Sequence, residues 1–331
     1  NAKIAIHPNG KSGTVNLAFI GAGSYAQGNL LPNLPDSENV VRKGVLTNSG
    51  TTSKRVAERF KFEFCTANEE DIIKNPDINT LFVTTRHDSH AGYVIKGLEN
   101  GKNVYVEKPL CLNISELVEI EKLTTEMKKS VMIGFNRRFS PHATLIKNKL
   151  GDGKMSMIYR VNAGYIPADF WIQDMETGGG RIIGEVCHFI DLMTFICGSI
   201  PVKVMASVLP DSQALNDTLN IIVEFENGST GVVAYYANGS KVLKKEYFEV
   251  YSSGTTAVLN DFKECTIYGN GKPKKSKLFA QDKGQKNMVQ KFIEGLKNGE
   301  TPIPMEQIFA VTKSTFAVIK SIQEDGAPVR F

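Results

Sequence analysis

The chain has 331 residues, 41% of them hydrophobic and 22% charged, with a formal net charge of +4. This length predicts two domains, and the composition is that of an ordinary globular protein. So mild a charge indicates neither a nucleic-acid partner nor a membrane partner. No apolar stretch is long enough to cross a bilayer, and the five cysteines include no CxxC pair. We therefore expect a cytoplasmic protein with reduced thiols and no disulfide framework.

The first pattern along the chain is a hydrophobic strand, a glycine-rich turn and a helix, in that order. Val15–Ile20 predicts the strand. A glycine turn in this context binds a dinucleotide, although a glycine turn by itself is often only a turn. Gly21 permits the tight turn, Gly23 lets backbone N–H groups approach a pyrophosphate, and Ala26 allows helix and strand to pack closely. The expected cofactor contacts on this turn are Gly21, Gly23, Ser24, Tyr25 and Ala26.

The end of the second predicted strand, Val40–Leu46, bears on which dinucleotide is bound. An NAD-selective site usually has Asp or Glu here to bind the ribose hydroxyls, and the segment that follows this strand has neither. Small polar side chains with Lys54 and Arg55 nearby favour NADP weakly over NAD. The alternative is a polar loop in which Ser53 caps the helix Lys54–Phe60. The expected cofactor contacts on this segment are Thr47, Asn48 and Ser49.

Two further strand ends are expected at the same edge of the sheet. Asn79–Thr84 and Val104–Val106 predict buried strands, and open parallel sheets bind ligands at the carboxyl ends of their strands. His87 and His90 follow the first of these strands, far from any cysteine or carboxylate cluster. Each is therefore expected to be structural or to position the cofactor, and no metal site is expected. The expected cofactor contacts here are Thr84, Thr85, Arg86, His87, His90, Glu107 and Lys108.

The charged pair Glu107-Lys108 stands between the strand Val104–Val106 and Pro109. Pro109 restricts Lys108 to an extended conformation, which holds its ammonium group on a fixed backbone. A lysine held in this way is suited to proton transfer. The alternative is that the two charges mark the point where a strand reaches water, and the three residues by themselves favour that alternative.

The order of the predicted elements changes beyond the predicted domain boundary at residue 138, and the new pattern begins after Gly153. Before the boundary, strands and helices alternate, which predicts a Rossmann-type, doubly wound parallel sheet. After Gly153, strands follow one another and Asn227-Gly228 makes a hairpin turn, which predicts a mostly antiparallel open sheet with helices on one side. The closing helix Met305–Ile322 is expected near the domain junction. The predicted divisions are a tail at 1–14, an NAD(P)-binding α/β domain at 15–138 and an α+β domain at 139–331.

The strands predicted for the second sheet are Met155–Ala163, Val202–Val208, Leu219–Phe225, Gly231–Tyr236 and Lys245–Tyr251. Leu219, Ile221 and Val223 alternate with mostly polar residues, so this sheet is expected to bury one face. The lysine-rich run at 272–277 is expected to be a solvated loop between a strand and a helix.

One helix of the second domain carries charged residues on a face of its own. Three glycines at 178–180 precede this helix, and glycines there let another molecule or backbone come close. Arg181, Glu185 and His188 share one side of the helix at spacings of four and three residues. A carboxylate one turn from a histidine can fix its tautomer and raise its basicity, which suits acid–base catalysis. The alternative is a satisfied polar stripe beneath the sheet, and His188 by itself favours that alternative.

Together these motifs resemble the glucose–fructose oxidoreductase, inositol dehydrogenase and rhizopine-catabolism (Gfo/Idh/MocA) family over nearly the whole chain. The resemblance rests on Gly21–Gly23, Glu107–Pro109, Gly134–Phe139 and Gly178–His188. It implies that Lys108 and His188 flank the reacting carbon and assist hydride transfer between a sugar-type alcohol and NAD(P). It also implies that Glu107 contacts the nicotinamide-ribose side of the cofactor, and that the exposed face of the second sheet pairs with another copy to give a homo-oligomer.

One departure from the family pattern concerns the residue four positions before His188. Many family members have an aspartate there, and this chain has Gly184 with Glu185 beside it. The glycine implies either a rearranged proton relay or weakened catalysis. The segments Thr85–His90 and Gly180–Glu185 also resemble a subgroup in which this module follows another dehydrogenase domain in one polypeptide, which implies that the chain is one half of a larger enzyme.

The sequence therefore predicts a NAD(P)-dependent dehydrogenase that acts on a hydroxyl of a sugar, cyclitol or nucleotide-sugar. Lys108, helped by His188 and Glu185, would take or give the hydroxyl proton. One rival hypothesis is a cofactor-binding module without chemistry, either a scaffold or a regulator that senses NAD(P). Another is an enzyme that retains its cofactor through an internal redox cycle. The candidates for substrate binding are Lys108, Asn136, Arg137, Arg138, Tyr165, Trp171, Arg181 and His188.

Overall fold

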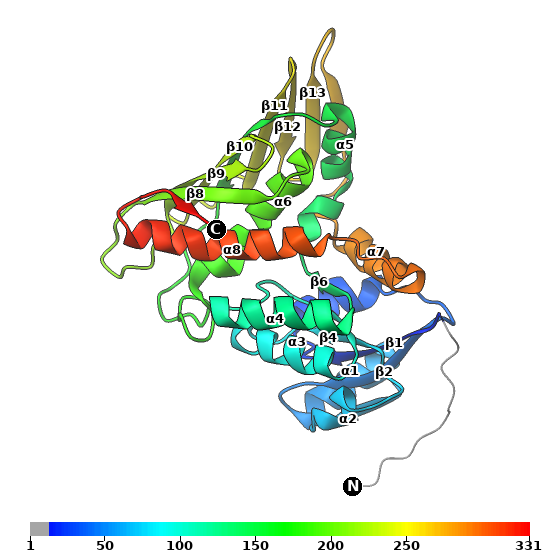
Figure 1. Cartoon of the computed structure of the whole chain (residues 1–331). Helices are drawn as coiled ribbons and strands as arrows, with labels where there is room; N and C mark the ends of the chain where they lie inside the picture. Colours follow the sequence, from blue (N-terminus) through cyan, green and yellow to red (C-terminus); the bar gives the residue numbers. More distant parts are fainter. Residues whose placement is uncertain (1–12) are drawn as a thin grey trace.

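A computed structural model describes residues 13–331 of the chain, which form two β-sheets with their helices (Figure 1). Residues 1–12 of the predicted tail lie outside the described residues. In Figure 1 the six-stranded sheet lies in the lower part of the molecule and the nine-stranded sheet in the upper part. None of the helices in the described range is both long enough and apolar enough to span a bilayer.

The first sheet is parallel throughout, with the strand order β3-β2-β1-β4-β5-β6. The chain runs from β1 to one edge, then returns to β4 and proceeds to the other edge, so the order reverses between β1 and β4. The predicted doubly wound parallel sheet is therefore confirmed. Its strands are β1 (Val15–Ile20), β2 (Val40–Leu46), β3 (Phe64–Thr66), β4 (Thr80–Val83), β5 (Asn103–Val106) and β6 (Val131–Ile133).

Most helices of this half connect the parallel strands, and the last one follows β6. The helices of this half are η1 (Ala26–Leu30), η2 (Leu31–Asn33), α1 (Gly50–Phe60), α2 (Glu70–Ile73), η3 (His87–Ser89), α3 (His90–Glu99), α4 (Ile114–Met127) and η4 (Asn136–Phe139). Helix α1 begins four residues before its predicted start, so the predicted cap at Ser53 is wrong. The Ser49 side chain caps the helix by accepting from the Thr52 N–H, whereas the Ser53 hydroxyl accepts from the Thr47 N–H at 2.9 Å.

The second sheet has the order β14-β13-β12-β11-β7-β10-β9-β8-β15. In the described part of the chain β7 and β10 are its one parallel pair, so the predicted mostly antiparallel sheet is confirmed. Its strands are β7 (Ser156–Asn162), β8 (Pro201–Val208), β9 (Leu219–Phe225), β10 (Thr230–Tyr236), β11 (Glu246–Ser252), β12 (Thr255–Asn260), β13 (Glu264–Tyr268), β14 (Lys274–Lys277) and β15 (Val329–Arg330).

Strand β14 corrects one prediction, because it lies within the lysine-rich run that was expected to be a loop. It pairs with β13 at the edge of the sheet. Charged lysine side chains are a common feature of edge strands, since they oppose pairing with a further chain. The signal for a strand was hidden because an exposed edge strand needs no apolar alternation.

Most helices of the second half lie on one face of the nine-stranded sheet, whereas the helix at residues 285–298 packs against η1, η2 and β1 of the first half (Figure 1). The helices of the second half are α5 (Pro141–Leu150), η5 (Ile182–Val186), α6 (Cys187–Cys197), α7 (Gln285–Asn298) and α8 (Met305–Gln323). Helix α6 is buried almost all round, as expected for a helix inside a core. Helix α8 contacts β8 and α6 of its own half and also β6 and α4 of the first half, which confirms its predicted place at the junction.

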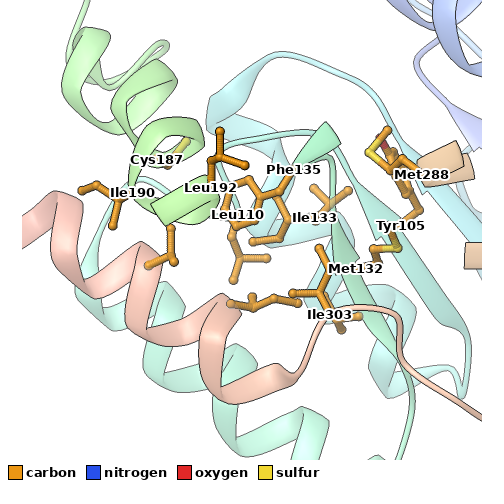
Figure 2. Close-up of a cluster of buried hydrophobic side chains, with 14 of the residues drawn as sticks. Tyr105, Leu110, Met132, Ile133, Phe135, Cys187, Ile190, Leu192, Met288 and Ile303 are labelled. Atoms are coloured by element: carbon orange, nitrogen blue, oxygen red, sulfur yellow. The ribbon is translucent and has the colours of Figure 1, made fainter. Parts of the chain in front are cut away.

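A continuous hydrophobic core joins the two halves. Figure 2 shows its central cluster, in which side chains of the first sheet meet side chains of α6, α7 and the segment before α8. Tyr105 and Ile133 of the first sheet and Phe135 are each no more than 1% exposed, as are Ile190 and Met288 on the other side. This packing fixes the carboxyl end of β5 against the beginning of α6.

A buried ion pair reinforces the same junction. The Arg138 guanidinium donates to the Asp191 carboxylate through Nε and Nη2 at 2.5–3.1 Å, and through Nη1 to the Gln307 side chain at 2.9 Å. Arg138 therefore links η4 to α6 and α8. It was expected to bind substrate, but its guanidinium is engaged by Asp191 and Gln307, and its side chain is only 3% exposed.

Replacing Arg138 with Met should lower the free energy of unfolding by about 3–5 kcal/mol, because it leaves the Asp191 carboxylate buried without its cation. Urea denaturation followed by circular dichroism measures this change. Arg55→Met, at an exposed position on α1, is the matched control and should change the free energy by less than about 0.5 kcal/mol. Equal stability of the two variants would show that Arg138 does not hold the junction together.

Candidate active site at the domain junction

The first cavity of the site lies where the strand order reverses. It has a volume of about 610 Å³ and opens beside the glycine turn after β1. Gly21 has φ +79°, and a Cβ there would lie 2.7 Å from the Thr84 carbonyl oxygen, so only glycine fits. No atom lies within 4 Å of the place a Cβ would take at Gly23, which leaves the backbone open to a ligand. This is the geometry that a dinucleotide pyrophosphate requires.

Most of the residues expected at the cofactor line this first cavity or the next. The lining residues of the first are Gly21, Ala22, Gly23, Leu46, Thr47, Asn48, Ser49, Thr52, Thr84, Thr85, Arg86, Asp88, Ser89 and Tyr93. Ser24 lines neither cavity and is exposed. Sequence reasoning missed Thr52, because α1 was predicted to begin beyond it. It also missed Tyr93, which lies inside α3 and carries no local signal of a binding role.

A second cavity, of about 370 Å³, continues from the first, since both are lined by Gly23, Thr84 and Thr85. Residues from both halves of the chain surround it. They are Gly23, Tyr25, Ala26, Thr84, Thr85, His87, His90, Glu107, Lys108, Asn136, Arg137, Trp171, Ile172, His188, Lys283 and Gln285. The structure therefore brings Lys108 and His188, 80 residues apart in sequence, to one cavity beside the dinucleotide site.

Lys108 extends from the end of β5 toward the start of α6. Its Nζ donates to the Gly184 carbonyl oxygen at 2.7 Å, and the peptide bond between Lys108 and Pro109 is cis. A Cβ at Gly184 would lie 3.1 Å from Cε1 of His87, so a larger residue at position 184 would press on that ring. Gly184 thus leaves room for His87 and supplies the acceptor that orients the lysine.

Glu107 lies buried beside Lys108 and accepts a hydrogen bond from the Tyr105 hydroxyl at 2.6 Å. Burial raises the pKa of Glu107 to about 7, although the Tyr105 hydrogen bond and the Lys108 ammonium oppose the rise. A Cβ at Gly134 would lie 2.7 Å from the carboxylate oxygens, so the glycine makes the space that this side chain occupies. Glu107 can therefore exchange a proton near neutral pH.

Two histidines form the wall of the second cavity nearest to the dinucleotide site. His87 Nδ1 lies 2.7 Å from the Gly178 carbonyl oxygen, and His90 Nδ1 lies 2.7 Å from that of Pro109. Burial, together with the nearby Lys108 charge, lowers the pKa of His87 to about 3. Burial lowers the pKa of His90 to about 4. Both rings are neutral at physiological pH and hold backbone segments in place, which agrees with a positioning role.

His188 lies in α6 on the other side of the second cavity. Burial, with the charges of Arg137 and Lys108 nearby, holds the pKa of His188 well below its usual range. Its Nδ1 is buried and has no hydrogen-bond partner within residues 13–331. The ring is therefore neutral and has a polar nitrogen that the protein leaves unused.

The helical spacing suggested that Glu185 pairs with His188, but Glu185 has other partners. Its carboxylate accepts from Lys245 at 2.5 Å, from Arg181 at 3.3 Å and from the Tyr235 hydroxyl. Burial would raise the pKa of Glu185, but the Lys245 ammonium and these hydrogen bonds lower it to about 2. The side chain stays ionised and is fully engaged, because the fold brings Lys245 and Tyr235 from the second sheet to meet it.

A third cavity, of about 220 Å³, lies beyond the second and shares Lys108, Arg137, Ile172 and His188 with it. Its lining residues are Lys108, Arg137, Ala163, Ile166, Ile172, Arg181, Gly184, Glu185, His188 and Lys245. Lys245 at this cavity and Lys283 at the second cavity were missed in the sequence. Each stands beside ordinary surface residues, and no local pattern sets it apart.

The remaining substrate candidates take different places. Arg137 lines the second and third cavities, which we call the inner cavities. Its Nε and Nη2 donate to the buried Glu246 carboxylate at 2.7 and 2.9 Å. Asn136 and Trp171 line the second cavity, and the Trp171 ring meets the His87 ring edge-on at 4.8 Å. Tyr165 is 64% exposed and lines a separate hollow beside Leu209, away from Lys108.

The described residues contain no group of three or more His, Cys, Asp or Glu side chains placed to hold a metal ion. The cavities instead offer backbone N–H groups, hydroxyls, cations and neutral histidines. Such a set suits a dinucleotide and a small polar molecule bound side by side.

Comparison with known proteins agrees with this arrangement. Residues 15–135 match the family model described as an oxidoreductase family with an NAD-binding Rossmann fold, and residues 147–258 match the model of the GFO/IDH/MocA C-terminal domain. The uncharacterised oxidoreductase YrbE of Bacillus subtilis is 26% identical over 65% of this chain and 64% of its own length. The inositol 2-dehydrogenase of Rhizobium meliloti is 26% identical over 48% of this chain and 50% of its own.

The chain thus spans between half and two thirds of the length of these two relatives. The myo-inositol 2-dehydrogenase of Thermotoga maritima is 24% identical, and that match covers 75% of this chain and 78% of that protein. Among solved structures, levoglucosan dehydrogenase in complex with NADH and levoglucosan has the same fold, with a TM-score of 0.84 over 96% of this chain and 99% of that chain at 19% identity. The chain belongs to the Gfo/Idh/MocA oxidoreductase family, with the family's NAD-binding Rossmann domain followed by its C-terminal domain.

Proposed function

We propose that the protein is a NAD(P)-dependent dehydrogenase acting on a hydroxyl of a small sugar, cyclitol or nucleotide-sugar. One observation carries the proposal: Lys108 and His188 line a single cavity that is continuous with the dinucleotide cavity. A substrate in that cavity would lie between these two side chains and the nicotinamide. The named inositol dehydrogenases among the relatives support the substrate class.

The roles of the side chains follow from their contacts. Bound NAD(P) would take up the hydride that leaves the carbinol carbon. The neutral amine of Lys108 accepts the hydroxyl proton, and in the reverse direction its ammonium returns that proton to the carbonyl oxygen. The hydrogen bond from Lys108 to the Gly184 carbonyl directs the lysine to one place in the cavity. Neutral His188 offers a second hydrogen-bonding group to the same substrate oxygen.

The second candidate is a NAD(P)-sensing module without chemistry. The observation that favours it is the position of Glu185, which is tied to Lys245, Arg181 and Tyr235 and gives His188 no carboxylate partner. Binding of the dinucleotide without turnover of any sugar or cyclitol would favour this module over the dehydrogenase. A tightly retained cofactor that never exchanges with free NAD(P) would instead indicate an internal redox cycle.

Gly23→Ala should weaken binding of NADH and NADPH by at least about tenfold, because the new methyl group occupies the space left for the pyrophosphate. Fluorescence titration of the purified protein with each dinucleotide measures this loss and also shows which dinucleotide the wild type prefers. Gly28→Ala is the matched control, since its methyl group also meets no atom within 4 Å and Gly28 lines neither cavity. If both variants bind like the wild type, the glycine turn is not the cofactor site.

Lys108→Met should slow turnover by about a hundredfold or more while leaving dinucleotide affinity nearly unchanged, because it removes the proton-transfer group and keeps the length of the side chain. Steady-state kinetics on a substrate found in a sugar and cyclitol panel tests the first part, and NADH titration tests the second. The control is Lys96→Met, on the exposed surface of α3. Unchanged turnover in Lys108→Met would remove Lys108 from the reaction.

We also propose that the outer face of the nine-stranded sheet pairs with a second copy of the chain. Ile158, Ile222, Tyr251 and Tyr268 are each at least 40% exposed. Ile158 and Ile222 both stand opposite Val232 of β10, so they share one face, turned away from the helices. An exposed apolar face on a sheet this broad is typical of an interface.

Ile222→Glu should therefore convert a dimer or larger assembly into a smaller species, because it places a charge in an apolar contact. Sedimentation velocity at several protein concentrations measures the change in mass. Val242→Glu, on a fully solvated loop outside this face, should leave the mass unaltered. A monomeric wild-type protein would contradict the proposal directly.

A further inference from the structure

The third cavity differs from the first two in its charge. Four of its lining residues are cationic, namely Lys108, Arg137, Arg181 and Lys245, and one is a carboxylate, Glu185. A small buried site lined in this way favours a bound anion, since a low-polarity surrounding strengthens each charge. From this charge pattern we infer that the substrate carries one carboxylate group, which lies in the third cavity, so that the substrate is an acidic sugar or polyol. The inference rests on the dehydrogenase function proposed above.

The cations around the inner cavities outnumber the ionised carboxylates that contact them. Glu185 is shared by Arg181 and Lys245, and Glu246 is shared by Arg137 and Lys283. Asp217 adds one further contact to Arg181 at 3.5 Å.

Lys108 forms no salt bridge with any residue in the range 13–331 and donates to a backbone carbonyl instead. Five cations thus face three carboxylates that are ionised, and Glu107 beside Lys108 is only partly ionised near neutral pH. With Lys108 as an ammonium, the form that returns a proton to a carbonyl oxygen, the excess is between one and two positive charges, which a monoanion balances. With Lys108 as a neutral amine the excess is one charge smaller.

Two buried polar atoms at this cavity have no partner in the described part of the protein. Arg181 Nε and His188 Nδ1 are both fully buried, and both residues line the third cavity. Neither atom has surface open to the cavity, and the other Arg181 nitrogens already donate within the protein. The Lys245 side chain is 36% exposed, so it is the cation that a ligand in this cavity can reach.

The shape of the two inner cavities fits a substrate with an anionic end. They share Lys108, Arg137, Ile172 and His188, so one molecule can extend from one into the other. The reacting hydroxyl would lie at Lys108 beside the dinucleotide, and the carboxylate would lie toward Lys245. A volume of about 220 Å³ is that of roughly seven water molecules, which accommodates the acidic end of a single sugar ring but no large group.

The test compares matched pairs that differ only in the acidic group, glucose with glucuronate and galactose with galacturonate, and adds glucose 6-phosphate. Binding is followed through the fluorescence of NADH bound to the full chain, and turnover through nicotinamide absorbance. At least one uronate should bind about tenfold or more tightly than its neutral partner. Its advantage should shrink as salt is added, because the contact is ionic.

The variant that isolates the proposed contact is Lys245→Gln. It should raise KM for the preferred uronate about tenfold and leave kcat and the constants for the neutral partner within about threefold. Lys245→Arg should restore most of the loss. The adjacent exposed residue provides the control, because Lys244→Gln leaves the cavity intact. NADH affinity, equal in all three variants, reports that each is folded.

The outcomes separate this inference from the proposed function. Turnover of neutral sugars with no preference for uronates would overturn the carboxylate site and keep the dehydrogenase. Tighter binding of a uronate with no turnover of any compound would support the site and reject the dehydrogenase. A clear preference for glucose 6-phosphate over glucuronate, or no binding of any of the five sugars, would overturn the inference.

Discussion

The apolar contact between the first sheet and helix α6 is the constraint on which the rest of this molecule depends. Tyr105, Ile133 and Phe135 on one side and Ile190 on the other are almost wholly removed from water, so the two halves are packed as one core at this point (Figure 2). That packing, rather than any flexible linker, sets the carboxyl end of β5 against the beginning of α6. The position of Lys108 relative to His188 follows from it.

Two carboxylates at this junction each contact two cations. Glu185 and Glu246 each lie between two cations from different elements, so a buried carboxylate stabilises groups that would otherwise be costly to bury. Burial, with the positive charges nearby, keeps His188 neutral, and Lys108 has no ionic partner in the described chain. These are the two side chains on which the proposed proton transfer relies.

Much of the fold could be predicted from local patterns. Strands β1, β2 and β9 have the predicted ends, because each has a strong apolar pattern. The start of α1 was misplaced because Ser49 and Ser53 are equally good caps by sequence. The strand β14 was missed because its lysines carry no apolar alternation. The start of α1 is decided by local contacts of Ser49 with Thr52 and of Ser53 with Thr47, whereas β14 is decided by its pairing with β13.

The sequence by itself determined the order of strands and helices, the family, and the strand ends where a dinucleotide and a reactive lysine would lie. These follow from short patterns, since a glycine turn and a charged strand end are local properties of the chain. The tertiary structure decided which charges meet. Arg138 pairs with Asp191 in the core, and Glu185 pairs with Lys245. In each pair the two residues are more than 50 positions apart in the sequence, so only the tertiary structure brings them together. The spacing of residues within one helix or strand therefore cannot predict these ion pairs.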